Sequence, residues 1–331
     1  MGAVQRSDPA SPGWGRRRAG RGFVYLDTRR RPLRARANVR RCRQLVIPPD
    51  WTEVWICPDA DGHIRATGTD AAGRRQYLYH PVWRAAREAE KYEHVLEVAA
   101  RLPSARRKVR SDLARPGMPR ERSCAVAFTL LDLGLFRIGA EEYEQEHGSF
   151  GLTTLKKHHL RLTRDRVAVF DYPAKSAQRR HLELSSDELW EPLGRLRRRR
   201  SGGSRLLAYC EQGAWAPLPA AAVAAYLKAL LGPEASAKDF RTWHATVLAA
   251  VTLAASGPAD DESAVREHVS RTIAEVAEQL GNTPAISRDS YIDPRVVETY
   301  EREGDLELPV PPLASPDEAS ERAVRELLED G

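Results

Sequence analysis

The first third of the chain holds short runs in which apolar and polar positions alternate, the spacing of β-strands. The runs lie at residues 23–26, 54–57, 63–68 and 76–79. Clusters rich in Pro, Gly and Asp separate them and favour turns. A stretch with helical spacing follows at about residues 81–100. This pattern predicts a small antiparallel sheet closed by a helix, together forming an N-terminal β-rich domain at residues 21–102.

Helical spacing dominates the second part of the chain. Residues 124–136 are almost entirely apolar, which predicts a buried helix, and further helices are expected at residues 216–231 and from Ser236. Short β-type runs predict a meander at residues 151–155, 158–162, 167–172 and 180–184. The fold class is therefore α+β, with a mainly α-helical second domain at residues 103–300 that contains a small β-meander.

One apolar stripe marks a long helix at residues 263–280, and this helix is followed by a sharp break. Gly281 supplies a helix stop, Thr283 a cap and Pro284 the first turn of a new short helix. Tyr291 falls near the end of that short helix. A tyrosine at such a corner can reach out of the fold, although a half-buried tyrosine at a helix end is the ordinary interpretation.

The two ends of the chain differ in charge. Residues 1–20 are rich in Gly, Pro, Ser and Arg and are expected to form a disordered basic arm. Residues 301–331 form an acidic tail with a short helical pattern at 320–329. The tail holds ten acidic and three basic residues, so of the net charge of +6, residues 1–300 carry +13. Such an excess suits a protein that binds a phosphate backbone. An ordinary basic surface would explain the excess about as well.

Several classes of protein are disfavoured by what the sequence holds. The cysteines Cys42, Cys57, Cys124 and Cys210 are scattered without a C-x-x-C pair, so a disulfide framework or a zinc site is not expected. The sequence shows no phosphate-binding loop motif, no carboxylate cluster with metal-ligand spacing, no apolar run of membrane-spanning length and no signal-peptide pattern. We expect a cytoplasmic protein, and these motifs call for neither a cofactor nor a metal.

Two arginines that precede Tyr291 in the sequence are further candidate site residues. Arg137 ends the apolar run in the sequence Phe-Arg-Ile-Gly, and a buried charge there must be paired or take part in chemistry. Arg241 lies in the sequence KDFRTWH at residues 238–244. An arginine, a second arginine and a late tyrosine, in this order, resemble the type IB DNA topoisomerases, specifically the short poxvirus-like bacterial enzymes. The resemblance extends from about residue 22 to residue 300.

The resemblance implies a catalytic role for five residues. Tyr291 would attack a DNA phosphate, and Arg137 and Arg241 would bind its oxygens. Lys175, in the turn at residues 173–177, would protonate the departing 5′-oxygen. Asn282 occupies the position at which many relatives have histidine, and an amide can donate a hydrogen bond to the phosphate without titrating. The implied activity is relaxation of supercoiled DNA without ATP, through a 3′-phosphotyrosyl intermediate and religation.

The last predicted strand of the first domain is the candidate DNA contact. Alternation places Tyr77 and Tyr79 on one face, beside Gln76, Arg74 and Arg75. The resemblance implies that this strand enters the major groove, whereas tyrosines packed on a sheet are the ordinary interpretation. The basic stretch at residues 101–120 would be a hinge or an ordinary linker. A hinge would let a monomeric clamp open around double-stranded DNA.

Two alternatives share parts of this pattern. A tyrosine recombinase uses the same catalytic order, but recombinases commonly have His-x-x-Arg where this chain has Lys238-x-x-Arg241, and their N-terminal domains are usually helical. A non-catalytic DNA-binding protein would account for the basic charge and the paired tyrosines. His244, three residues after Arg241, is expected to be an ordinary helix histidine or to face DNA.

Overall fold

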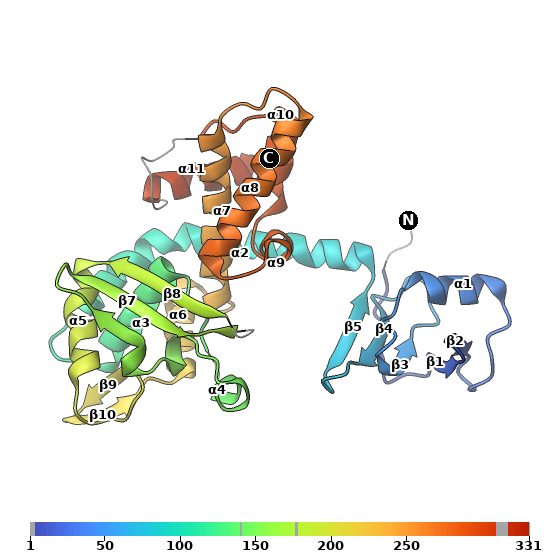
Figure 1. Cartoon of the computed structure of the whole chain (residues 1–331), viewed down its shortest axis with the longest axis horizontal. Coiled ribbons are helices and arrows are strands. Elements are labelled where there is room, and N and C mark those ends of the chain that lie inside the picture. The colour runs from blue at the N-terminus through green and yellow to red at the C-terminus, as the bar shows by residue number, and fades with distance from the viewer. Residues whose placement is uncertain (1–3, 140, 176–177, 309–316, 331) are drawn as a thin grey trace. The chain divides into compact units, whose positions relative to one another are not determined.

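The computed structural model describes residues 4–139, 141–175, 178–308 and 317–330 (Figure 1). It divides into two compact units, Met1–Glu93 and His94–Gly331. The predicted boundary after residue 102 falls inside one continuous helix, α2 (Pro81–Leu113). None of the helices described is long and apolar enough to cross a membrane.

The first unit is built on a five-stranded antiparallel sheet with strand order β2-β1-β3-β4-β5. The strands are β1 (Trp14–Ala19), β2 (Gly22–Leu26), β3 (Thr52–Ile56), β4 (Ile64–Thr69) and β5 (Arg75–Tyr79). Helix α1 (Arg36–Gln44) contributes Cys42 to a small core that also contains Val54 and Ile56. The four predicted strands are confirmed, whereas β1 and α1 were not predicted.

The prediction of a disordered arm at residues 1–20 is wrong for residues 4–20; residues 1–3 lie outside the described part of the chain. Strand β1 pairs with both β2 and β3. Arg16 donates to the carbonyl of Ile47 at 2.8 Å and lies over the Phe23 ring. Arg16, one of the arginines that made this segment look unfolded, therefore has partners within the folded unit, and the carbonyl that it binds is distant in sequence.

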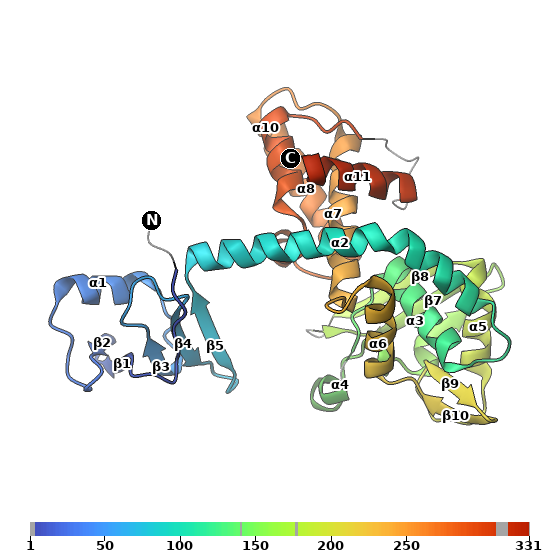
Figure 2. The ribbon, with the colours of Figure 1, turned by 180° about the vertical axis from the view of Figure 1, so that it is seen from behind.

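The second unit is mainly helical (Figure 2). Its buried side chains form one large core. Helix α3 (Arg120–Gly134) is almost wholly buried and packs against α5, α6, α7 and strand β9, and Phe128 meets Phe240 edge-on at 5.1 Å. The other helices are α4 (Glu141–His147), α5 (Asp187–Arg198), α6 (Ala220–Leu231), α7 (Ala237–Ser256), α8 (Glu262–Leu280), α9 (Pro284–Ser290), α10 (Pro294–Glu303) and α11 (Glu318–Asp330). The strands are β6 (Leu160–Leu162), β7 (Val167–Pro173), β8 (Arg179–Ser185), β9 (Ala208–Glu211) and β10 (Ala214–Pro217).

Two local predictions for this unit need correction. Residues 151–155 do not form a strand; a short 3₁₀ turn, Leu152–Thr154, takes its place, and the meander has the order β6-β7-β8. The helix expected at residues 216–231 starts at Ala220, because the preceding residues pair as the hairpin β9–β10.

The predicted hinge at residues 101–120 is also wrong in its first part. Helix α2 continues to Leu113 with Pro103 inside it. Leu102, Ala105 and Val109 are all buried in the core, at a helical spacing that keeps them on one face. Their burial stabilises the helix through a position where proline removes one backbone hydrogen bond.

The acidic tail ends in a packed helix. α11 lies against α7, with Val324 and Leu328 buried, so the predicted helical pattern at residues 320–329 is confirmed. Residues 309–316 of the tail lie outside the described residues.

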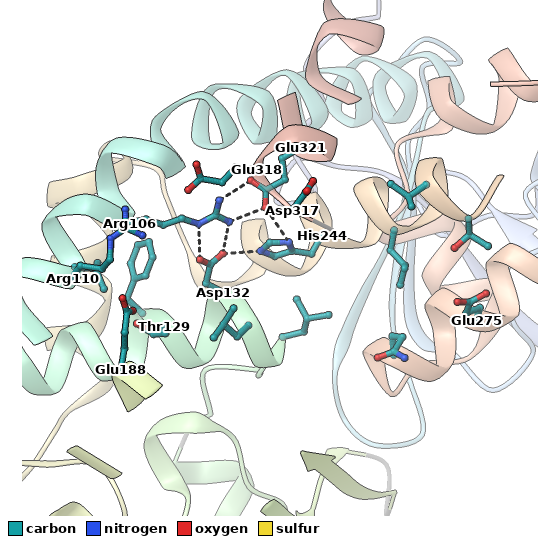
Figure 3. A pocket seen from close by; sticks show the side chains of 18 of the residues that line it. Arg106, Arg110, Thr129, Asp132, Glu188, His244, Glu275, Asp317, Glu318 and Glu321 are labelled. Atoms are coloured by element: carbon teal, nitrogen blue, oxygen red, sulfur yellow. Dashed lines mark hydrogen bonds and ion pairs between the residues drawn. The ribbon is translucent and has the colours of Figure 1, made fainter. Parts of the chain in front are cut away.

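A charged network joins α11 to the rest of the unit and lines one side of a cavity of about 820 Å³ (Figure 3). Arg106 forms ion pairs with Asp132 and Glu321, both at 2.8 Å. His244 lies 2.8 Å from Asp132 and has only 12% of its side chain exposed. His244 is therefore held inside this network, which agrees with the first of its two expected roles, that of an ordinary helix histidine.

Candidate active site

Tyr291 follows a helix break whose signals are local. Gly281 ends α8 in the left-handed conformation (φ 59°, ψ 52°), which glycine adopts without strain. Thr283 caps α9 with its side chain, and Pro284 occupies the first turn. Tyr291 lies at the C-terminal cap of α9. The predicted helix–break–helix corner is confirmed.

Arg137 lies just after α3 and reaches this corner. Its Nη2 donates to the carbonyl of Gly281 at 3.0 Å and to Oδ1 of Asn282. The amide Nδ2 of Asn282 is buried and has no hydrogen-bond partner among the described residues. The fold thus holds Arg137 and Asn282 in contact and leaves the NH2 group of the amide free to donate to another oxygen.

Arg241 lies beside Tyr291 and is only 3% exposed. Nη1 donates to the carbonyl of Leu135 at 2.6 Å, and Nη2 donates to the carbonyl of Leu280 at 3.0 Å. These acceptors lie at the C-terminal ends of α3 and α8, where backbone carbonyls lack helical partners. The guanidinium carbon of Arg241 is 5.0 Å from the centre of the Tyr291 ring.

The electrostatics favour a reactive phenol. Burial raises the pKa of Tyr291, but the positive charges of Arg241, Arg137 and Lys238 outweigh burial and hold that pKa below its usual value. Burial and the like charge of Arg137 lower the pKa of Arg241 to about 10, so the guanidinium stays charged at neutral pH. The corner therefore stabilises a phenolate and presents permanent positive charge beside it.

Sequence reasoning missed two residues of this corner. The Lys238 ammonium lies 5.8 Å from the centre of the Tyr291 ring, whereas the sequence indicates this lysine only as part of a motif. Thr246 Oγ1 accepts from the backbone N of Asp293 at 3.0 Å and donates to the carbonyl of Tyr291 at 3.3 Å. Their position on the helix that carries Arg241 was the one available signal.

Lys175 is the predicted residue that the structure leaves apart. It is exposed two residues after the end of β7 and forms no hydrogen bond or ion pair with the described residues. The next two residues of its turn, Ser176 and Ala177, lie outside the described part. Four of the five predicted catalytic residues are therefore gathered at one place, and Lys175 is presented on the surface.

Strand β5 displays its two tyrosines as predicted. Tyr77 and Tyr79 are 45% and 46% exposed, with stacked rings whose centres are 6.0 Å apart. Arg74 and Gln76 are held by Asp70, at 2.9 and 2.8 Å. Arg75 donates to the carbonyl of Glu53 at 3.2 Å and also to the Thr67 hydroxyl. The tyrosines offer free surface, whereas the three polar side chains already have partners within the unit.

No group of three or more His, Cys, Asp or Glu side chains in the described ranges is arranged to hold a metal ion. The chemistry that the corner offers comes from a phenol, guanidinium groups and an amide. Such a set suits transfer of a phosphoryl group to and from an aromatic oxygen.

The comparisons with known proteins agree with this chemistry. A family model described as the catalytic core of eukaryotic DNA topoisomerase I matches residues 81–305, and one described as the N-terminal domain of bacterial DNA topoisomerase IB matches residues 22–70. The DNA topoisomerase 1B of Acanthamoeba polyphaga mimivirus is 25% identical over 294 residues, which cover 86% of this chain and 87% of the relative. The matches favour this class over the recombinase and the non-catalytic protein, and the chain therefore belongs to the family of type IB DNA topoisomerases.

Proposed function

We propose that this chain relaxes supercoiled DNA without a nucleotide by cutting one strand through Tyr291 and resealing it. The observation that supports this most strongly is the placement of the Tyr291 ring 5.0 Å from the buried Arg241 guanidinium, beside Arg137 and Asn282. A phenol surrounded by fixed positive charge suits attack on a phosphodiester.

In the proposed reaction the Tyr291 oxygen attacks the phosphorus atom, and the bond from phosphorus to the 5′-oxygen breaks. Arg137, Arg241 and Asn282 donate to the non-bridging oxygens as charge develops on them, and each positioned donor typically contributes about 10²–10³ in rate. The product is a 3′-phosphotyrosyl link and a strand with a free 5′-hydroxyl. After that strand has rotated, the hydroxyl gives up its proton, attacks the phosphorus and releases the phenolate of Tyr291.

Lys175 is proposed as the acid that gives a proton to the departing 5′-oxygen and takes it back on religation. Its exposed position just after β7 supports this assignment, because the ammonium has no competing partner among the described residues. In the closed complex the hairpin would bring it to the phosphate.

The proposed DNA contact of the first unit is β5, through Tyr77 and Tyr79. Both rings are exposed and parallel, which suits contact with base edges in the major groove while the arginines bind phosphates. Gln76, Arg74 and Arg75 would first have to exchange their partners within the unit for DNA. We further propose that the protein acts as a monomeric clamp, in the cytoplasm at the nucleoid.

The decisive experiment is relaxation of a supercoiled plasmid by the purified chain in the presence of a chelator and without nucleotide. Tyr291→Phe should abolish relaxation and the covalent adduct with DNA. Tyr209→Phe is the matched control, because it removes a phenol from β9, outside the site, and should relax DNA normally. Relaxation that survives Tyr291→Phe would show that the nucleophile is misassigned.

A further inference from the structure

A third arginine, Arg180, reaches the corner from strand β8. Its Nη2 lies 3.4 Å from the carbonyl of Gly134. Its Nη1 lies against Gly281, so close that a methyl group on that glycine would meet it at 3.1 Å. Gly281 is also the residue whose carbonyl accepts from Arg137. Arg180 and Arg137 thus contact the same residue of the helix break.

These arginines are gathered without an acidic counterpart. None of Arg137, Arg180 and Arg241 forms an ion pair with a carboxylate of the described residues. Burial and the charge of Arg137 lower the pKa of Arg180, and Arg180 in turn lowers that of Arg241. Burying several positive charges together costs free energy unless an anion binds among them.

Arg180 is half-buried, and two other arginines of this unit with little exposed surface differ from it. Arg106 has two carboxylates, those of Asp132 and Glu321. Arg199 donates to the carbonyls of Leu196, Leu206 and Arg205. Arg180 has one long hydrogen bond among the described residues, so its guanidinium is neither neutralised nor saturated with acceptors. A structural arginine at this depth would be expected to have more partners.

We propose that Arg180 is a further positioning residue of the phosphate site. Its charge adds to the field that binds the anionic transition state, and its contact with Gly281 sets the positions of Arg137 and Asn282. The proposal rests on the proposed function, because it assumes that the anion at this corner is the scissile phosphate. The bonds formed and broken when Tyr291 attacks the phosphorus are unchanged, since Arg180 neither gains nor loses a proton.

The test compares two substrates in single-turnover cleavage. One carries an ordinary scissile phosphate, and the other carries a methylphosphonate at that position, which lacks one negative charge. Arg180→Gln should slow cleavage of the ordinary substrate by about 10²-fold, because it removes a charge from the site and lets Arg137 and Asn282 move from their positions, and it should slow the neutral substrate much less. Arg180→Lys, which keeps the charge, should recover most of the rate.

Arg199→Gln is the matched control, because it also removes a buried guanidinium that holds backbone carbonyls. A structural loss should slow both substrates by the same factor. If Arg180→Gln does the same, or cleaves the ordinary phosphate as fast as the unaltered chain, the role of Arg180 is refuted. If the unaltered chain cleaves DNA through Tyr291 and Arg180→Gln cleaves it at the same rate, this inference is refuted and the proposed function stands.

Discussion

Replacing Asp132 with Asn tests whether the charged network stabilises the catalytic unit. The Asp132 carboxylate accepts from Arg106 Nε at 2.8 Å and Nη2 at 2.9 Å and contacts His244, with 7% of its side chain exposed. Removing one partner of a buried ion pair typically costs about 3–5 kcal/mol, because it leaves the other charge uncompensated. Arg106 keeps Glu321, so we expect the lower end, about 3 kcal/mol.

Thermal unfolding measures this loss. For a unit of this size, each kcal/mol corresponds to about 2–4 °C, so Asp132→Asn should lower the Tm by about 6–12 °C. Asp171→Asn is the matched control, since its pair with Arg179 has 39% and 77% of the side chains exposed. Surface pairs contribute little, so the control should unfold near the wild-type Tm. Equal shifts in the two variants would refute the reasoning.

The pH dependence supplies a second readout. Burial raises the pKa of Asp132, but the hydrogen bonds from His244 and Arg106 outweigh it and hold the pKa far below its usual range. A carboxyl whose pKa falls on folding stabilises the protein above its unfolded pKa of about 4, and this contribution is lost as the pH falls through the folded value. The difference between wild type and Asp132→Asn should therefore be full at neutral pH and shrink below about pH 4.

Two further substitutions probe the site itself. Lys175→Ala should slow cleavage by roughly 10²-fold or more. A substrate whose 5′ leaving oxygen is replaced by sulfur should restore the rate, because a thiolate leaves without a proton. If the rate does not recover, Lys175 is a phosphate-binding residue and not the acid. Gly281→Ala should lose about 1–2 kcal/mol from its left-handed backbone and slow cleavage at least about tenfold, since the new methyl group meets Arg180. Gly148→Ala, at φ 58° with open space around it, should lose similar stability in thermal unfolding and cleave normally.

What the sequence could predict was local. The helix break follows from Gly281, Thr283 and Pro284, whose conformational preferences act within a few residues. The contact between Arg137 and Asn282 spans 145 positions, and no periodicity predicts it. There the resemblance to a known family supplied the expectation that the arginines gather near the tyrosine.

The errors have a common physical cause. Strand β1 was missed because its arginines look like a solvated arm, whereas Arg16 is bound by carbonyls about thirty residues away, among them that of Ile47. Pro103 suggested a hinge, but the buried face of α2 outweighs the lost hydrogen bond. Hairpin β9–β10 was missed because its residues pair with each other rather than follow a helical stripe. In each case a tertiary contact overrode a local preference.

Backbone carbonyls at the C-terminal ends of α3 and α8 accept hydrogen bonds from Arg137 and Arg241. Main-chain oxygens orient both side chains, so their charge remains undiminished toward a ligand, as it would not if aspartate or glutamate held them. A main-chain oxygen remains when the side chain of its residue is substituted. Alanine scanning of the surrounding shell would therefore overlook these supports, and their removal requires an altered peptide link, such as a backbone ester introduced by chemical synthesis.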